Sequence, residues 1–206
     1  MNKSVLSLAL TAVLGVSLSA CGGSTQASAP TSPSVESIAP STPTPTPAAL
    51  NKSPRGNIIK KLGEPGGVTN KEGKQMVNFT INSITPDVPC TNQYAQKSQN
   101  GHFVVLDVTV ETTADFVSST DQRPLTFDLN PGMFKFVGKN GTTYNGNLGS
   151  GAAYGCLADA EQLANGRGVG PAEKATGKVV VDVPDTTGTL VYQNFMIGSG
   201  GWEWNF

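Results

Sequence analysis

The chain has 206 residues, a formal net charge of −1 at pH 7 and only 14% charged residues. Proteins that bind nucleic acid through its phosphates carry a basic surface, and no basic stripe interleaved with aromatic residues occurs in this sequence. Composition and charge therefore argue against nucleic acid as a partner.

The first twenty residues have the layout of a secretory signal peptide. Lys3 precedes an apolar run from Val5 to Val16, which is short of the roughly 20 residues that a membrane-spanning helix needs. The residues that follow, Leu18-Ser19-Ala20-Cys21, resemble the bacterial lipobox. That resemblance implies that the Cys21 thiol carries lipid such as diacylglyceryl and palmitate, and that the mature chain begins there. We therefore predict a lipoprotein signal peptide over residues 1–20 and an anchor on the extracytoplasmic face of a bacterial membrane.

Residues 21–54 form a second compositional region. The stretch after Cys21 has no aromatic residue, almost no charge and many Ser, Thr, Ala and Pro residues, with a strict alternation of Thr and Pro from Thr42 to Pro47. Such a segment buries too little apolar surface to offset its conformational entropy. The sequence predicts a disordered tether, extended by its prolines, that lifts a folded domain away from the bilayer.

Residues 55–206 are long enough for one domain with its own core. Apolar residues alternate with polar ones in residues 75–82, 103–111 and 178–183, and turn signals such as Asn140-Gly141 separate the runs. This period of two, with many β-branched residues, predicts an all-β antiparallel sandwich or barrel. The expected inward faces are Val77, Phe79 and Ile81 in the first run, and Val104, Leu106, Val108 and Val110 in the second. Only residues 157–164 are expected to be helical.

Two cysteines, Cys90 and Cys156, remain once Cys21 is lipidated. In an exported domain two cysteines are expected to pair, and neither lies in a Cys-x-x-Cys motif. We predict a structural disulfide that ties the loop at Cys90 to the glycine-rich loop at residues 149–155. A redox-active or metal-binding pair is the alternative, but His102 is the one histidine of the chain and belongs to no ligand cluster.

The sequence carries no recognisable catalytic set. There is no Gly-x-Ser-x-Gly elbow and no Ser-x-x-Lys spacing, and a histidine-based triad would depend on His102 alone. Gly177-Lys178 lacks the upstream glycine of a phosphate-binding loop. We predict a protein that is not an enzyme and has no cofactor and no metal. A calcium site is kept as an alternative, with four carboxylates in or beside one long loop as its candidate ligands: Glu111, Asp115, Asp121 and Asp128.

Three segments resemble a known family. They are Gly101–Val110, Phe127–Leu129 together with Asn140–Tyr144, and Gly170–Pro184, where a Glu-containing turn leads into a valine-rich strand that ends in Val-Pro. Together they are similar to the telokin-like domain-of-unknown-function family of bacterial lipoproteins and secreted proteins, which includes a secreted mycobacterial immunogenic protein. The resemblance implies an immunoglobulin-like β-sandwich and supplies no catalytic residues. It departs from the family at Glu111–Thr113 and in the aromatic C-terminus.

These observations predict a lipid-anchored, envelope-exposed and non-catalytic β-sandwich that binds a protein or an envelope component. Trp202, Trp204 and Phe206 share one side of a C-terminal strand, which is either a binding surface or the inner face of the sandwich. The loops at residues 115–124 and 146–155 are the next candidate binding regions. Alternatives are a host-interaction antigen, a prophage-type superinfection-exclusion lipoprotein, and a calcium-binding or hydrolytic domain.

Overall fold

The computed structural model describes residues 50–194 and 200–206, which belong to one compact unit, Pro47–Phe206. The predicted signal peptide, the predicted lipidation site Cys21 and most of the predicted tether lie outside the described residues. No helix among the described residues is long and apolar enough to cross a membrane.

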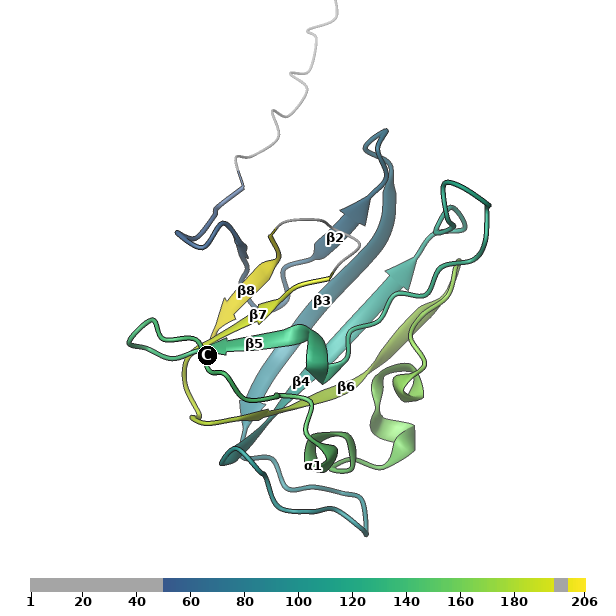
Figure 1. The fold of residues 1–206 in the computed structure, drawn as a ribbon. Helices are drawn as coiled ribbons and strands as arrows, with labels where there is room; N and C mark the ends of the chain where they lie inside the picture. Colours follow the sequence, from purple (N-terminus) through teal and green to yellow (C-terminus); the bar gives the residue numbers. More distant parts are fainter. Residues whose placement is uncertain (1–49, 195–199) are drawn as a thin grey trace, which may run out of the picture. The chain divides into compact units, whose positions relative to one another are not determined.

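The unit consists of two β-sheets (Figure 1). One sheet has the order β2-β3-β4-β6, with every neighbouring pair antiparallel. The other has the order β1-β8-β7-β5, in which only the pair β1 and β8 is parallel. The strands are β1 Ile58–Ile59, β2 Gly66–Thr69, β3 Gln75–Pro86, β4 His102–Thr112, β5 Phe134–Val137, β6 Lys174–Val183, β7 Thr189–Tyr192 and β8 Trp202–Asn205. The all-β sandwich predicted from the sequence is confirmed.

The central strands β3 and β4 show why the sequence folds in this way. Val77, Phe79 and Ile81 of β3 are fully buried, and so are the alternate residues from Val104 to Val110 of β4. Their polar neighbours face outward, and Asn82 donates a hydrogen bond to Asp107 across the two strands (2.7 Å). Alternation along each strand therefore selects the face that turns toward the second sheet.

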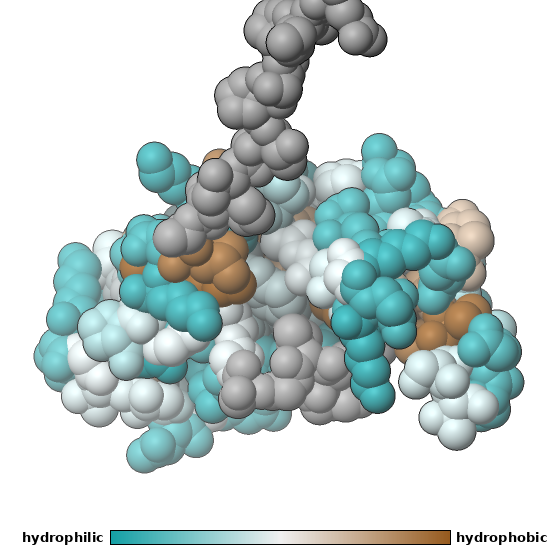
Figure 2. Space-filling view, turned by 90° about the horizontal axis from the view of Figure 1, so that it is seen from above, coloured by the Kyte–Doolittle hydropathy of each residue, from teal (hydrophilic) through white to brown (hydrophobic). Residues whose placement is uncertain are grey.

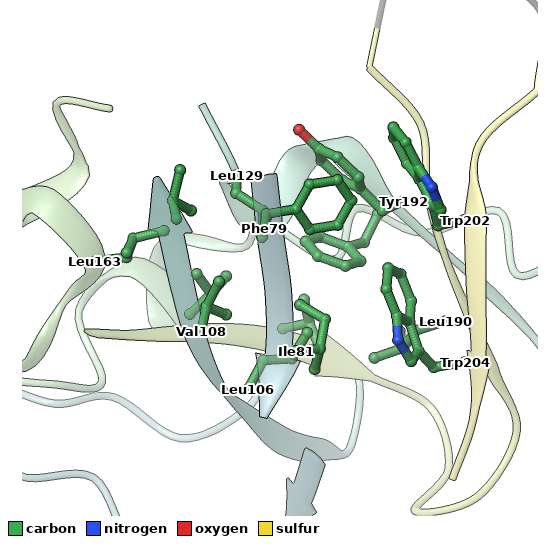
Figure 3. Packing of buried hydrophobic residues seen from close by; sticks show 14 of the residues in the cluster. Phe79, Ile81, Leu106, Val108, Leu129, Leu163, Leu190, Tyr192, Trp202 and Trp204 are labelled. Atoms are coloured by element: carbon green, nitrogen blue, oxygen red, sulfur yellow. The ribbon is translucent and has the colours of Figure 1, made fainter. Parts of the chain in front are cut away.

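One large core lies between the sheets (Figure 3). Phe79 of β3 lies at its centre, with its ring centroid 4.7 Å from that of Trp202, 5.5 Å from that of Tyr192 and 5.6 Å from that of Phe127. The contacts with Trp202 and Tyr192 are edge-to-face and the contact with Phe127 is stacked, and such pairs add to the free energy gained from burial alone. Burial raises the pKa of the Tyr192 phenol, whose hydroxyl donates a hydrogen bond to the carbonyl of Asp128 (2.6 Å).

The C-terminal aromatic residues belong to this core. Trp202 and Trp204 are 3% and 1% exposed, and Phe206 packs on Phe136 with ring centroids 6.2 Å apart. A binding surface built on these aromatic side chains was one of the two interpretations left open by the sequence, and the structure contradicts it for both tryptophans. They face inward because β8 lies inside its sheet, between β1 and β7, and its apolar side covers Phe79.

A smaller second cluster covers the outer face of the β4–β6 pair. It contains Val105, Val180, Ala153, Leu157 and the predicted disulfide, which joins Cys90 to Cys156. The disulfide prediction is confirmed. The bond fastens the loop that follows β3 onto the segment that follows the short helix α1, Gly151–Tyr154.

The prediction of a helix over residues 157–164 is wrong. The α-helix lies earlier, where the Ser150 hydroxyl accepts a hydrogen bond from the Ala153 amide and so caps its first turn. The 3₁₀ turns η2, Asp159–Glu161, and η3, Leu163–Gly166, follow it. A continuous helix is interrupted because Ala158 and Gln162 have extended backbone angles (ψ 147° and 144°), and Ala164 and Asn165 within η3 adopt left-handed angles (φ 47° and 49°).

The segment that leads into the sandwich is held by one buried carboxylate. Glu203 of β8 accepts hydrogen bonds from the Ser53 hydroxyl (3.1 Å), the Asn57 amide (3.1 Å) and the guanidinium of Arg55 (2.8 and 3.1 Å). Backbone hydrogen bonds reach back to Asn51, ahead of the predicted domain start at residue 55. These contacts join the end of the predicted tether, at Asn51 and Ser53, and the residues just after it to β1 and β8.

One face of the sandwich is shown with its surface hydropathy in Figure 2. The face shown in Figure 2 is largely hydrophilic, with small and separate apolar areas. The large apolar side chains exposed among the described residues are Leu50, Leu62, Tyr94 and Tyr154. They are few, so we look for a candidate site among the cavities rather than in a broad apolar patch.

Candidate functional site

The candidate site lies along the outer edge of β6. This strand pairs with β4 on one side, and its other side faces loops and turns. Gly177 allows that close approach, because a Cβ atom at this position would lie 2.6 Å from the Cα of Leu163. Turn η3 can therefore rest against the strand backbone, and Gln162 forms a parallel bridge with Lys178.

A cavity of about 60 Å³ lies between this edge and the segments that cover it. We call it the edge pocket. Its walls are largely apolar and come from both hydrophobic clusters, including Leu157, Leu163, Val179 and Val180. Its polar lining consists of Asp128, Asn130, Tyr154, Gln162 and Lys178. An apolar cavity with a few polar groups at its rim is the usual form of a small binding site.

Tyr154 forms the most accessible part of the lining. It ends helix α1, is 49% exposed, and its hydroxyl lies 3.4 Å from the side-chain oxygen of Asn130. Burial of the ring raises the pKa of its phenol, so the hydroxyl stays protonated and able to donate a hydrogen bond at neutral pH. Tyr154 therefore presents both an apolar ring and a donor to whatever enters the pocket.

The charges at the rim are unequal. Lys178 pairs with Glu161 (2.8 Å), and this pairing, with a further hydrogen bond from Thr91, lowers the pKa of the Glu161 carboxyl. Asp128 accepts a hydrogen bond from the Asn130 amide (2.6 Å) and has no cation within ion-pair distance among the described residues. The rim is therefore biased toward negative potential, which favours donors and cations.

The backbone beside the pocket has an unusual conformation. Ala164, Asn165, Gly166 and Gly168 all have positive φ angles. The left-handed conformation costs an ordinary L-residue about 1–2 kcal/mol, and Ala164 lacks a polar side chain that would compensate. Strained backbone is retained where packing enforces it and is frequent at binding sites.

A second buried carboxylate positions the helix that carries Tyr154. Asp182 of β6 accepts hydrogen bonds from the Ser150 hydroxyl (2.6 Å), the Ser98 hydroxyl and the backbone amides of Gln99 and Asn100 (2.9 and 3.1 Å). It is fully buried, so these four donors replace its hydration. The Asp182 side chain thereby fixes both the start of α1 and the loop before β4.

We expect Asp182→Asn to lower the free energy of unfolding by about 2 kcal/mol. The asparagine side chain keeps one acceptor oxygen, but its NH₂ group replaces the other and cannot accept a hydrogen bond. At least one of the backbone amides of Gln99 and Asn100 is then left without an acceptor. Urea unfolding followed by circular dichroism measures the loss. Asp107→Asn, on the outer sheet face, is the matched control and should change stability by less than about 0.5 kcal/mol. Equal effects of the two substitutions would contradict the structural role of Asp182.

His102 lies in a different, open hollow of about 540 Å³. It begins β4 as predicted, and its Nδ1 atom lies 2.8 Å from a carboxylate oxygen of Asp87. Ser98 lines the same hollow, but its hydroxyl donates to Asp182 and accepts from the Gly101 amide. In the described part of the chain no hydroxyl or thiol is hydrogen-bonded to His102. The His102–Asp87 pair therefore resembles the base and the orienting carboxylate of a catalytic triad, but it has no nucleophile beside it.

The structure does not assemble the four candidate calcium ligands. Glu111 pairs with Lys174 (3.6 Å), Asp115 pairs with Lys74, Asp121 lies 3.5 Å from the guanidinium of Arg123, and Asp128 lines the edge pocket. Within residues 50–194 and 200–206, no group of three or more His, Cys, Asp or Glu side chains is arranged to hold a metal ion.

Sequence reasoning identified only part of the edge pocket. The predicted binding loop at residues 146–155 contributes Ala153 and Tyr154, whereas the loop at 115–124 does not line it. Residues on η3 and β6 were missed as site residues. Two signals in the sequence could have found them: a glycine within the β6 strand, and the repeated glycines of Gly166–Gly170.

Comparison with known proteins yields one weak structural likeness. No family model matches the sequence, and no curated protein matches it. Among solved structures, the chain is similar to a secreted protein from Mycobacterium tuberculosis, MPT63, with 15% sequence identity and a TM-score of 0.44. The similarity covers 73% of this chain and 98% of that one. Membership of the telokin-like family stays a prediction from the sequence.

Proposed function

We propose that this protein is a lipid-anchored, non-catalytic recognition module of the bacterial cell envelope, and that the edge pocket is its binding site. The observation that carries recognition is the pocket itself, a largely apolar cavity with a polar rim, which lies between the outer edge of β6 and the segments that cover that edge. Its lining includes an amide, a phenol, a carboxylate and a paired ammonium group, but no serine, cysteine or histidine. This set can bind and orient a ligand, and it holds no Ser–His or Cys–His pair of the kind that activates a hydrolase nucleophile.

The disulfide supports an extracytoplasmic location. Cys156 is fully buried in the second cluster and bonded to Cys90. Disulfides persist mainly in oxidising compartments outside the cytoplasm, which agrees with the predicted signal peptide and lipidation at Cys21. Acylation there would place the sandwich at the membrane surface on its proline-rich tether.

We expect Cys21→Ser to release the protein from the membrane. Without the thiol no acyl chain is attached, and each buried methylene contributes about 0.8 kcal/mol of membrane affinity. Cell fractionation followed by immunoblotting measures the distribution, with unsubstituted protein in the membrane fraction and the variant in the soluble extracytoplasmic fraction. Persistent membrane retention of Cys21→Ser would contradict the lipid anchor.

Recognition through the edge pocket is tested by a pair of tyrosine variants. Tyr154→Ala removes one wall of the pocket, whereas Tyr94→Ala removes an 81% exposed ring that lies on another loop. Both are compared with the unsubstituted protein in crosslinking to isolated envelopes. A crosslinked partner lost in Tyr154→Ala and kept in Tyr94→Ala supports the proposal. A partner captured equally by both variants would exclude this pocket as the binding site.

A further inference from the structure

The backbone of β6 has one unpaired position at the edge pocket. In an antiparallel ladder, successive residues direct their N–H and C=O groups alternately to the two sides of the strand. The Asp182 amide donates to the Leu148 carbonyl (2.9 Å), away from β4. Val180, two residues earlier with no bulge between, therefore directs its N–H and C=O groups to the same outer edge.

Neighbouring positions at that edge have partners. Asp182 bonds to Leu148, and Lys178 is bridged to Gln162. Between them, Val180 is only 5% exposed and lines the edge pocket, yet no hydrogen bond from a described residue reaches its outer N–H or C=O group. Buried backbone groups are nearly always paired with protein, water or ligand. One donor and one acceptor are thus left available in an otherwise apolar site.

Resting on the proposed recognition function, we infer that the edge pocket binds an extended peptide segment of a partner protein. A residue of that segment pairs its own N–H and C=O groups with those of Val180, and its aliphatic side chain enters the cavity. This is strand addition limited to one residue. A peptide group is the common biological unit that presents one donor and one acceptor beside a side chain.

The size of the cavity selects the side chain. About 60 Å³ is well below the roughly 150 Å³ of an apolar cavity that encloses benzene, so only the end of a branched aliphatic side chain enters while its stem stays at the rim. Leu157, Leu163 and Val179 offer apolar contact to a Val or Leu side chain. The negative bias from Asp128 favours a Lys or Arg next to that residue in the partner segment.

Blocked amino acids test this inference directly. The probe is N-acetyl-L-leucine N-methylamide, added to the ¹⁵N-labelled secreted chain carrying Cys21→Ser and followed by NMR. We expect the Val180 amide signal to shift and saturate, with at least about ten-fold tighter binding than for N-acetylglycine N-methylamide, which lacks the side chain. Adding a lysine before the leucine should tighten binding about three-fold, and added salt should reduce that gain.

Matched ligands and variants complete the test. Replacing the leucine N–H of the probe by an ester oxygen removes one bond to Val180 and should weaken binding about five-fold. Tyr154→Ala should weaken the leucine probe, whereas Tyr94→Ala should not, and unchanged melting temperatures exclude unfolding as the cause. The peptide assignment is overturned if the leucine, glycine and ester probes bind alike, or if the Val180 signal does not move. If Tyr154→Ala still abolishes envelope crosslinking in that case, the recognition function stands with a ligand that is not a peptide.

Discussion

Removing the disulfide by the double substitution Cys90→Ala and Cys156→Ala is expected to lower the free energy of unfolding by about 3–4 kcal/mol. The bond joins residues 66 apart in the sequence. In the chain-entropy model, closing a loop of that length lowers the conformational entropy of the unfolded chain and so raises its free energy by about 4 kcal/mol. The melting temperature should fall by roughly 10 °C, given about 2–4 °C per kcal/mol for a domain of this size.

The disulfide also keeps the second cluster in place. The backbone amides of Thr91 and Asn92 both donate to the Cys156 carbonyl, so the loop after β3 lies along the segment that carries the cysteine. Thermal unfolding followed by circular dichroism measures the loss. Unsubstituted protein treated with reductant should lose a similar amount. If the double variant melts within about 2 °C of the oxidised protein, noncovalent packing alone holds this region.

The second large effect is expected for Glu203→Gln, which should lower the free energy of unfolding by about 2–3 kcal/mol. The carboxylate is 3% exposed and accepts bonds from Ser53, Arg55 and Asn57. A glutamine loses the charge that balances Arg55 and turns an NH₂ group toward donors. Because Arg55 is partly exposed, its guanidinium regains hydration in the variant, which keeps the loss below that of a fully buried pair.

The loss should be accompanied by local detachment of the N-terminal segment. The amide of Ile58 donates to Gly201, and the amide of Lys60 donates to Glu203, so these two protons report on the contact between β1 and β8. Hydrogen exchange should accelerate at both amides in Glu203→Gln before the rest of the sandwich opens. Glu64→Gln, at an exposed ion pair with Lys60, is the matched control, with an expected loss under about 1 kcal/mol.

The Glu203 contribution depends on pH in a defined direction. Burial alone would raise the pKa of this carboxyl, but hydrogen bonds from Arg55, Asn57 and Ser53 outweigh it and hold the pKa below its ordinary value of 4.5. A lowered pKa in the folded state stabilises the fold fully above the unfolded value, and this stabilisation is lost as the pH falls through the folded pKa. The stability difference between unsubstituted protein and Glu203→Gln should therefore narrow from pH 6 to pH 3. A constant difference over that range would contradict the carboxylate's role.

Much of the strand framework could be predicted from local pattern. Phe79 and Leu106 were assigned to the inner face because every second residue around them is apolar. A shift of the strand register by one residue would turn all of these apolar side chains toward solvent. The pairing of Cys90 with Cys156 was predictable because an exported chain that lipidates Cys21 has only two thiols left. These conclusions need only neighbouring residues and the chemistry of the compartment.

The candidate site could be predicted only in part, because its members are distant in the sequence. Asn130, Tyr154, Leu163 and Val180 meet at one edge because Gly177 permits close backbone approach and Asp182 positions α1. No periodic pattern encodes such contacts. The same holds for Glu203, which appears in the sequence as an ordinary polar residue between two tryptophans and is in fact the acceptor for three separate side chains.

The sequence by itself determined the alternation of apolar residues in the main strands, the all-β class and the expected cellular location of the protein. It could do so because alternation and signal motifs are local properties of the chain. It determined that Trp202, Trp204 and Phe206 share one side of a strand. Only the tertiary structure decided that this side faces Phe79, because burial depends on which strands flank β8 and on what the opposite sheet presents. Packing likewise decided that no hydrogen bond from a described residue reaches the outer backbone groups of Val180, since such a partner must come from a segment far away in the chain.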